Sequence, residues 1–220
     1  PSRFWFIPQI AHSFNADGSG GNMYNAYLFY ESNSNGGPFM DASYTRYDSN
    51  FNASTLFNNY GNDYDEISVS GGYQFVRNTK TFSNISVNAG FYRARRLSDG
   101  FNYQNGFNLN AFYKVNGWLN ISHYLSYDRP NDFDANNEKI TYDNVLGETF
   151  AKVLFGSNSI SAGFYGGKYF GSTLYNPYAN IDLSFFGRLR LIGSYNYREF
   201  ADVKQSIYSV KLDLKVFDKL

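Results

Sequence analysis

The chain of 220 residues contains no cysteine, which excludes a disulfide framework, a zinc site built from thiolates and a cysteine nucleophile. It also lacks an excess of charge, because 19 Lys and Arg residues are balanced by 19 Asp and Glu residues. A formal net charge of zero gives no electrostatic attraction to nucleic acid or to an acidic bilayer surface. We therefore expect no nucleic-acid partner.

Long apolar runs are absent as well. No run of about 18 apolar residues occurs and the mean hydropathy is −0.46, so the sequence excludes a transmembrane helix. A membrane-spanning β-strand is compatible with these values, because its side chains alternate in polarity and its average hydropathy is low. No signal peptide begins at Pro1, and we expect the sequence to be a mature secreted form or an excised domain.

Aromatic residues are abundant instead. The chain has 21 Tyr and 22 Phe against 2 Met, and aromatic residues make up 20% of the sequence. A globular core needs far fewer rings. Girdles of aromatic side chains at the two interfaces of a membrane would use them.

The clearest pattern in the sequence is an alternation with a period of two. Residues 67–75 place Ile, Val, Gly, Tyr and Phe on one face and Ser, Ser, Gly and Gln on the other. Residues 85–92 repeat the pattern after a polar break at 77–80, which predicts two strands joined by a tight turn. A polar face of Ser, Asn, Gly and Gln suits a watery interior, and the opposite apolar face suits lipid.

Similar alternation recurs along the whole chain and predicts roughly twelve strands of about ten residues, the length that crosses a bilayer when tilted. The expected strands are 4–14, 23–32, 40–48, 67–75, 85–92, 107–115, 118–127, 141–155, 160–170, 179–185, 189–197 and 207–217. Short turns alternate with longer polar loops such as 50–65, 128–139 and 171–177. This asymmetry is typical of an outer-membrane barrel whose two ends both lie on the periplasmic side.

The last expected strand alternates and ends on Phe217, which resembles the C-terminal assembly signal of outer-membrane barrels. The whole chain resembles a bacterial outer-membrane β-barrel, similar in size and plan to the oligogalacturonate-specific porins, which are small channels for acidic sugars. The resemblance implies an all-β fold in which residues 1–220 form a single membrane-spanning, up-and-down antiparallel barrel. It also implies a Gram-negative outer membrane, with lipid bilayer and lipopolysaccharide as partners.

Charged residues on the polar faces are the strongest functional signal. In the expected registers, eleven of them point to the lumen: Glu31, Asp41, Lys114, Glu148, Lys152, Asp182, Arg190, Arg198, Lys211, Asp213 and Lys215. A transverse field in a narrow pore selects polar or zwitterionic solutes such as sugars. The alternative is that these charges pair with one another and plug the lumen, since a barrel of this size has limited interior room.

A second basic group lies beyond the apolar band, toward the expected extracellular end. It consists of Arg93, Arg95 and Arg96. In that position, arginine side chains either meet anionic lipid headgroups or guard the mouth of the pore.

Catalytic and metal-binding patterns are weak. Outer-membrane lipid hydrolases place a Ser two residues from a His on one strand face, but His12 is followed at that spacing by Phe14 and His123 by Leu125. We therefore predict no enzyme, with a lipid hydrolase assembled across strands as the alternative. The acidic loops 62–66 and 128–138 offer oxygen ligands for calcium, but Asp132, Asp134 and Glu138 lack the glycine that lets a calcium loop turn sharply. We expect these loops to be solvated, and we predict no metal and no cofactor.

These patterns together predict a passive channel, or porin, for the transport of small hydrophilic solutes, including saccharides, which selects by pore size and lumen charge. The first alternative is the barrel domain of a larger outer-membrane protein that anchors or forms the pore for polysaccharide export or secretion. A soluble all-β carbohydrate-binding module is a further class, and such a module would stay dispersed without detergent.

Overall fold

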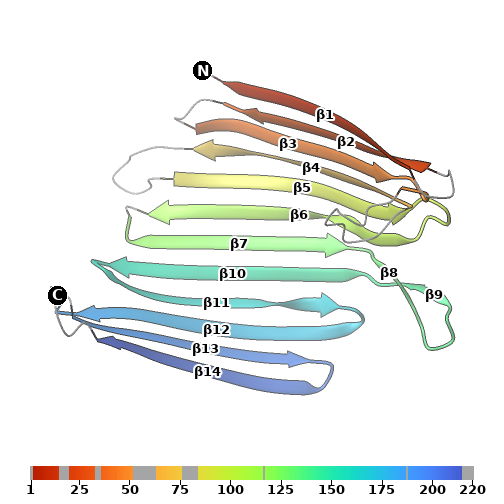
Figure 1. Ribbon diagram of the computed structural model, residues 1–220. Coiled ribbons are helices and arrows are strands. Elements are labelled where there is room, and N and C mark those ends of the chain that lie inside the picture. The colour runs from red at the N-terminus through yellow and green to blue at the C-terminus, as the bar shows by residue number, and fades with distance from the viewer. Residues whose placement is uncertain are drawn as a thin grey trace. The chain divides into compact units, whose positions relative to one another are not determined.

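The computed structural model describes residues 2–14, 20–32, 36–51, 63–75, 84–115, 117–186 and 188–214. Over these ranges the protein is all-β, with twelve strands in one antiparallel sheet and two short strands in a second (Figure 1). The order of the large sheet is β1-β2-β3-β4-β5-β6-β7-β10-β11-β12-β13-β14, so neighbours in the sheet follow one another along the chain. In the described ranges, the structure contains no helix that is both long and apolar enough to cross a membrane.

The strands are long for a soluble β protein, in which five or six residues are usual. The large sheet contains β1 (Arg3–Phe14), β2 (Gly20–Glu31), β3 (Gly36–Tyr47), β4 (Tyr64–Phe75), β5 (Asn84–Arg96), β6 (Asn102–Val115), β7 (Leu119–Asp128), β10 (Asn144–Phe155), β11 (Asn158–Tyr169), β12 (Ser172–Phe185), β13 (Leu189–Phe200) and β14 (Val203–Leu214). The small sheet pairs β8 (Asn131–Phe133) with β9 (Lys139–Thr141).

The chain falls into two compact units. The first comprises Pro1–Phe75, Val87–Leu109 and Ser126–Asp143, and the second comprises Val76–Ser86, Asn110–Leu125 and Asn144–Leu220. Strands β1 to β4 and most of β5 belong to the first unit, whereas β10 to β14 belong to the second.

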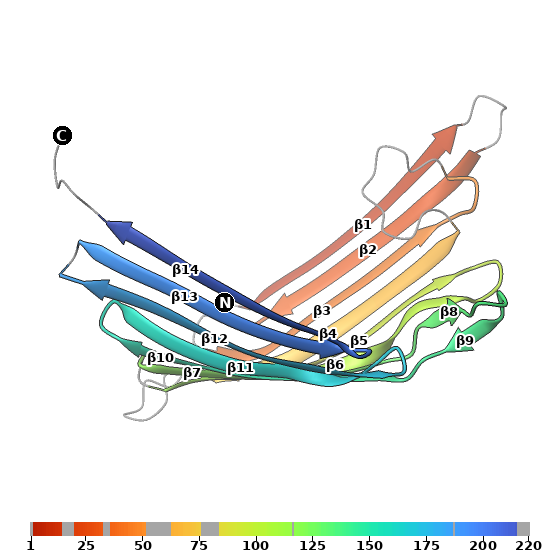
Figure 2. The same cartoon turned by 90° about the horizontal axis from the view of Figure 1, so that it is seen from below.

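In the first unit, β1 to β4 run side by side as an antiparallel meander (Figure 2). Residues that pair across such strands project from the same face. The register aligns Leu28 with Ala42 and Ala42 with Val69, which builds one apolar face. The opposite face aligns Asn25 with Thr45 and is polar.

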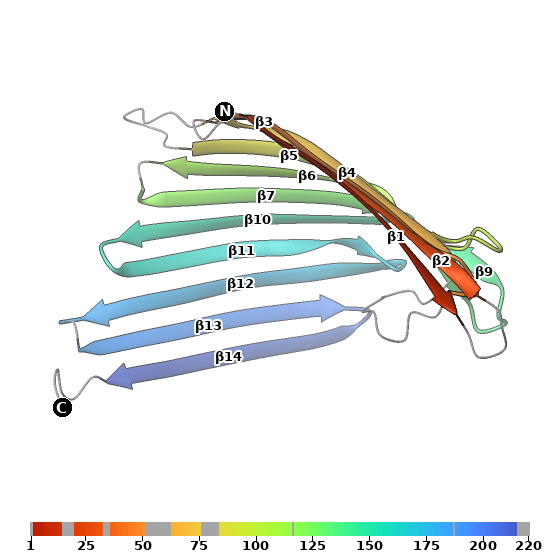
Figure 3. The ribbon, with the colours of Figure 1, turned by 45° about the horizontal axis from the view of Figure 1, so that its top comes forward.

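Strands β10 to β14 of the second unit form another meander with the same division (Figure 3). Val153 pairs with Ile160, and Ile160 pairs with Ile181, on the apolar face. Asn180 pairs with Ser161 and with Ser194 on the polar face. Each unit therefore presents two unlike sheet surfaces.

Large apolar side chains on these sheets are exposed rather than packed in an interior. Val69 is 38% exposed, Ile160 is 47% exposed and Leu212 is 63% exposed. A buried cluster of aromatic side chains forms instead at the junction of β3 and β4. It contains Tyr47, Phe51 and Tyr64, and the rings of Tyr47 and Tyr64 stack with centroids 5.0 Å apart.

The structure confirms the all-β class and the alternation of residues 67–75. Ile67 pairs with Tyr44 on the apolar face, whereas Ser70 pairs with Asp41 on the polar face. The number of strands in the large sheet also agrees with the sequence prediction. Phe217 and the predicted turn at 78–80 lie outside the described residues.

The predicted loop at 171–177 is wrong. Phe170 and Gly171, with φ of 46° and 78°, make the turn by themselves, and β12 begins at Ser172. Pro177 pairs with Phe164 within the strand, because a strand accepts proline where the ladder does not need its missing N–H. The connection between β13 and β14 is also short, so the predicted alternation of short turns and long loops fails at the β11–β12 and β13–β14 connections.

The predicted loop at 128–139 is also partly wrong. It contains β8 and the first residue of β9, which form a small hairpin. The ring of Phe133 on β8 stacks on Phe101 with centroids 5.0 Å apart, and this contact anchors the hairpin.

The close approach of β6 and β7 generates a stability prediction. A Cβ atom at Gly106 would overlap the carbonyl oxygen of Tyr127 and lie 2.8 Å from the Cα of Asp128. Backbone atoms cannot move aside cheaply, so we expect Gly106→Ala to lower the free energy of unfolding by about 1–3 kcal/mol, as overpacking does. Urea unfolding of the full chain, followed by tryptophan fluorescence, measures this change.

Gly147→Ala is the matched control. The nearest atom to a Cβ at Gly147 lies 3.6 Å away, which is an ordinary van der Waals distance. A stability loss that is equal in the two variants would contradict the described packing of β6 against β7.

Candidate functional site

The charged residues that the sequence assigns to a lumen lie on the polar faces wherever the structure gives their register. In the first unit these are Glu31 and Asp41. In the second unit the residues that share the face of Asn180 and Ser194 are Glu148, Lys152, Asp182, Arg190, Arg198, Lys211 and Asp213. Lys114 lies on β6 and Lys215 lies outside the described residues.

Four of these charges form two ion pairs, one between β12 and β13 and one within β14. Arg190 donates to both carboxylate oxygens of Asp182, at 2.8 Å from Nε and 2.7 Å from a terminal nitrogen. Lys211 lies 3.0 Å from Asp213, which is in turn the register partner of Arg190. The side chains are 32% to 66% exposed, so each pair stabilises the fold only weakly. The pairing neutralises much of the basic character that the sequence gives to the last two strands.

A groove opens on the polar face of the second unit, next to these pairs. Its volume is about 570 Å³, and it is lined by Glu148, Tyr165, Asn176, Tyr178, Asn180, Ser194, Tyr195 and Asn196. The Tyr178 hydroxyl donates a hydrogen bond to the carboxylate of Glu148. Sequence reasoning identified only Glu148 in this groove, because uncharged Asn and Tyr on an alternating strand give no distinctive local signal.

The polar face of the first unit is held by hydrogen bonds between polar side chains of neighbouring strands. Asn25 donates to Gln9 at 3.1 Å, and Thr45 donates to Asn25 at 3.2 Å. Ser70 donates to the carboxylate of Asp41. These contacts join β1 to β2, β2 to β3 and β3 to β4, so side-chain hydrogen bonds cross each of the three strand boundaries on the polar face.

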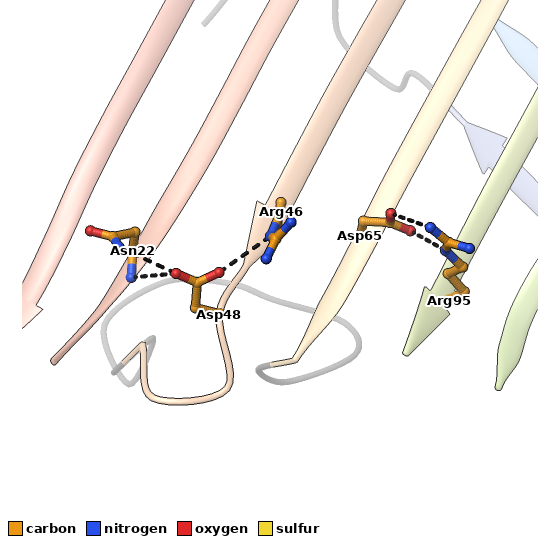
Figure 4. A network of polar contacts seen from close by, with 5 residues as sticks. All are labelled: Asn22, Arg46, Asp48, Asp65 and Arg95. Atoms are coloured by element: carbon orange, nitrogen blue, oxygen red, sulfur yellow. Dashed lines mark hydrogen bonds and ion pairs between the residues drawn. The ribbon is translucent and has the colours of Figure 1, made fainter. Parts of the chain in front are cut away.

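Charged side chains form a network at one end of the apolar face of the first unit (Figure 4). Asp65 accepts two hydrogen bonds from Arg95, at 3.0 Å and 3.2 Å, and its side chain is only 7% exposed. Arg93 lies 3.6 Å from the same carboxylate. Asp48 accepts from Arg46 at 3.2 Å and from the backbone and side chain of Asn22 at 3.3 Å.

The three arginines of the predicted lipid-headgroup or pore-mouth group are thus divided between two partners. Arg93 and Arg95 contact Asp65. Arg96 instead lies 3.5 Å from Asp99, and its guanidinium lies over the ring of Phe101 at 5.1 Å from the centroid. The sequence placed the arginines together, but their pairing depends on which strand lies next to β5.

The two histidines each contact one polar side chain. His123 Nδ1 lies 3.1 Å from the Thr149 hydroxyl, and His12 Nδ1 lies 2.8 Å from the side-chain oxygen of Asn22. A hydrolytic site also requires an orienting group for the base and donors for an oxyanion. The lipid hydrolase stays an alternative prediction from the sequence.

The acidic loops considered for calcium do not form a cluster in the described part of the chain. No group of three or more His, Asp or Glu side chains there is arranged to hold a metal ion. Asp65, which belongs to the first acidic segment, is engaged by arginine instead.

Comparison of the chain with family models, with curated proteins and with solved structures found no match. The resemblance to the oligogalacturonate-specific porins therefore stays a prediction from the sequence.

The ion pairs of Asp65 generate a second stability prediction. Replacing this buried carboxylate by Asn removes the partner of two arginines, so we expect Asp65→Asn to lower the free energy of unfolding by about 1–3 kcal/mol. Urea is the appropriate denaturant, because guanidinium would screen the ion pairs.

Asp143→Asn is the matched control. Asp143 pairs with Arg129 at 2.9 Å, but both side chains are 52% exposed, and we expect a loss of about 0–1 kcal/mol. Equal losses in Asp65→Asn and Asp143→Asn would contradict a special role for the buried carboxylate.

Proposed function

We propose that the chain is a membrane-spanning, up-and-down β-barrel of the bacterial outer membrane and acts as a passive channel for small hydrophilic solutes. The observation that carries this proposal is the pair of unlike sheet faces. Side chains such as Val69, Phe164 and Leu212 are exposed on the apolar face. Exposing so much apolar surface to water is unfavourable, at about 25 cal/mol per Å², and hydrocarbon removes that cost.

The length of the strands supports the same proposal. Most strands of the large sheet have 12 residues. At about 3.3 Å per residue, such strands are long enough to cross a hydrocarbon layer of about 30 Å when tilted. Closure of the sheet would satisfy the edge strands β1 and β14, which lipid otherwise leaves without hydrogen-bond partners.

The polar face is then the wall of an aqueous lumen. Its ion pairs, Arg190 with Asp182 and Lys211 with Asp213, set positive and negative charges side by side. Such a wall orients dipolar solutes without strongly favouring ions of one sign. The channel selects by pore size and by this field, and it performs no covalent chemistry.

Adjacent residues on β4 provide a test of which face meets lipid. Lysine in the middle of a lipid-facing surface costs about 2–4 kcal/mol, whereas lysine in a lumen costs little. We expect Val69→Lys to fold poorly into lipid vesicles, with a loss of that size measured by urea titration. Ser68→Lys is the matched control on the opposite face and should fold like the parent chain.

Two outcomes would contradict the proposed membrane placement. One is a Val69→Lys variant that inserts as well as Ser68→Lys. The other is a parent chain that stays monomeric and dispersed without detergent, which the soluble carbohydrate-binding module predicts.

Ion conduction tests the channel itself. We expect the parent chain, added from detergent to planar lipid bilayers, to produce discrete conductance steps that grow with salt concentration, because an open aqueous lumen conducts ions. Detergent without protein is the control. An absence of steps at every salt concentration would exclude the open channel and favour a lumen filled by paired charges or a barrel that only anchors a larger assembly.

A further inference from the structure

We propose that the groove on the polar face of the second unit is a binding subsite for a neutral saccharide, with a sugar ring seated on Tyr178. This inference deepens the proposed function and rests on it, because it assumes that the polar face meets a solute in water.

Tyr178 is held flat across the sheet by its neighbours. Its register partner on β11 is Gly163, and a Cβ atom there would overlap the Tyr178 hydroxyl and lie 2.9 Å from its Cε2. The ring therefore occupies the space that any other residue at position 163 would fill. Phe150 lies nearly parallel to it, with ring centroids 6.2 Å apart, and Glu148 on β10 accepts a hydrogen bond from its hydroxyl.

This arrangement makes an aromatic platform. The ring crosses β11 between its own strand, β12, and the carboxylate on β10, and it lines the groove. A flat ring of this kind offers an apolar surface beside a polar edge. The C–H faces of a pyranose ring match that surface, and the sugar hydroxyls reach the polar groups around it.

Those polar groups are mostly amides. Asn176 and Asn180 lie two residues on either side of Tyr178 and share its face, and Asn196 is its register partner on β13. All three line the groove together with Ser194. An amide side chain both donates and accepts hydrogen bonds, as does a hydroxyl, so this set complements a solute that carries only hydroxyl groups.

The charge of the groove favours neutral over acidic sugars. Among the described residues that line it, Glu148 carries the only charge. Its carboxylate accepts hydroxyl protons but repels a uronic acid carboxylate. The two arginines on this face of β13 are not part of the lining: Arg190 is bound by Asp182, and the guanidinium of Arg198 lies over the ring of Phe200 at 5.9 Å from the centroid. The site therefore differs from the acidic-sugar channels that the sequence resembles.

The volume of the groove is consistent with a saccharide ligand. Sites for small molecules usually measure about 300–1,000 Å³, and the groove falls within that range. Contributions from β10, β11, β12 and β13 make it a surface of the sheet wall rather than of a loop, so its geometry is set by the register of the strands.

Isothermal titration calorimetry of the full chain in detergent tests the subsite. The probes are maltohexaose and cellohexaose as neutral saccharides, with trigalacturonate as the acidic one. We expect at least one neutral probe to bind, and to bind at least 10-fold more tightly than trigalacturonate. Tyr178→Ala should weaken that binding at least 10-fold, whereas Tyr178→Phe, which keeps the ring, should weaken it less than Tyr178→Ala.

Two glycine variants test whether saccharide binding depends on the position of the Tyr178 ring across β11. Gly163→Ala places a methyl group where the ring lies and should weaken binding about as much as Tyr178→Ala. Gly147→Ala, on the opposite face of β10 with room for the methyl group, should bind like the parent chain. Circular dichroism establishes that each variant is folded, and Tyr178→Ala carries the test if Gly163→Ala does not fold.

The subsite is overturned if the folded parent chain binds neither neutral probe, if it binds trigalacturonate more tightly, or if Tyr178→Ala binds as well as the parent. Calorimetry does not depend on conduction, so the two proposals fail separately. A chain that conducts ions but binds no sugar excludes the subsite alone. A chain that binds sugar but does not conduct excludes the channel and retains the groove.

Discussion

Backbone hydrogen bonding between neighbouring antiparallel strands is the constraint on which the other features of this protein depend. Because successive side chains point to opposite faces, a slip of one residue would move every side chain of a strand to the other surface. The observed register keeps Val69 beside Ala42 and Ser70 beside Asp41. Within each unit, this register produces one surface that favours an apolar medium and one that favours water.

The ends of the strands in the first unit combine aromatic packing with ion pairs. Tyr64 packs on Tyr47, whereas the next residue, Asp65, points to the other face and binds Arg95. One short stretch of β4 thus supplies a ring to the buried cluster and a carboxylate to the charged network. The rings therefore pack on the polar face, and the fixed charges lie at the end of the apolar face.

Glycine has a structural use on these strands that goes beyond turns. At Gly106 the missing side chain leaves room for the backbone of β7, and at Gly163 it leaves room for the ring of Tyr178. The second case links fold to function, because the ring is placed on the sheet wall beside Asn176 and Asn180 rather than projecting freely. Because the ring is already fixed against the sheet, little conformational entropy would be lost from Tyr178 when a sugar binds to the proposed subsite.

The sequence by itself determined the all-β class, the strands and the face to which most charged residues belong, because a period of two is a local property of the chain. Only the tertiary structure decided which side chains pair with one another. Asp65 meets Arg95, and Glu148 meets Tyr178, across 30 positions in each case, and local patterns carry no information about such distances. The same reason explains the missed start of β12. Turn-forming residues around Pro177 predicted a loop, but pairing with β11 supplies the hydrogen bonds that keep the segment extended.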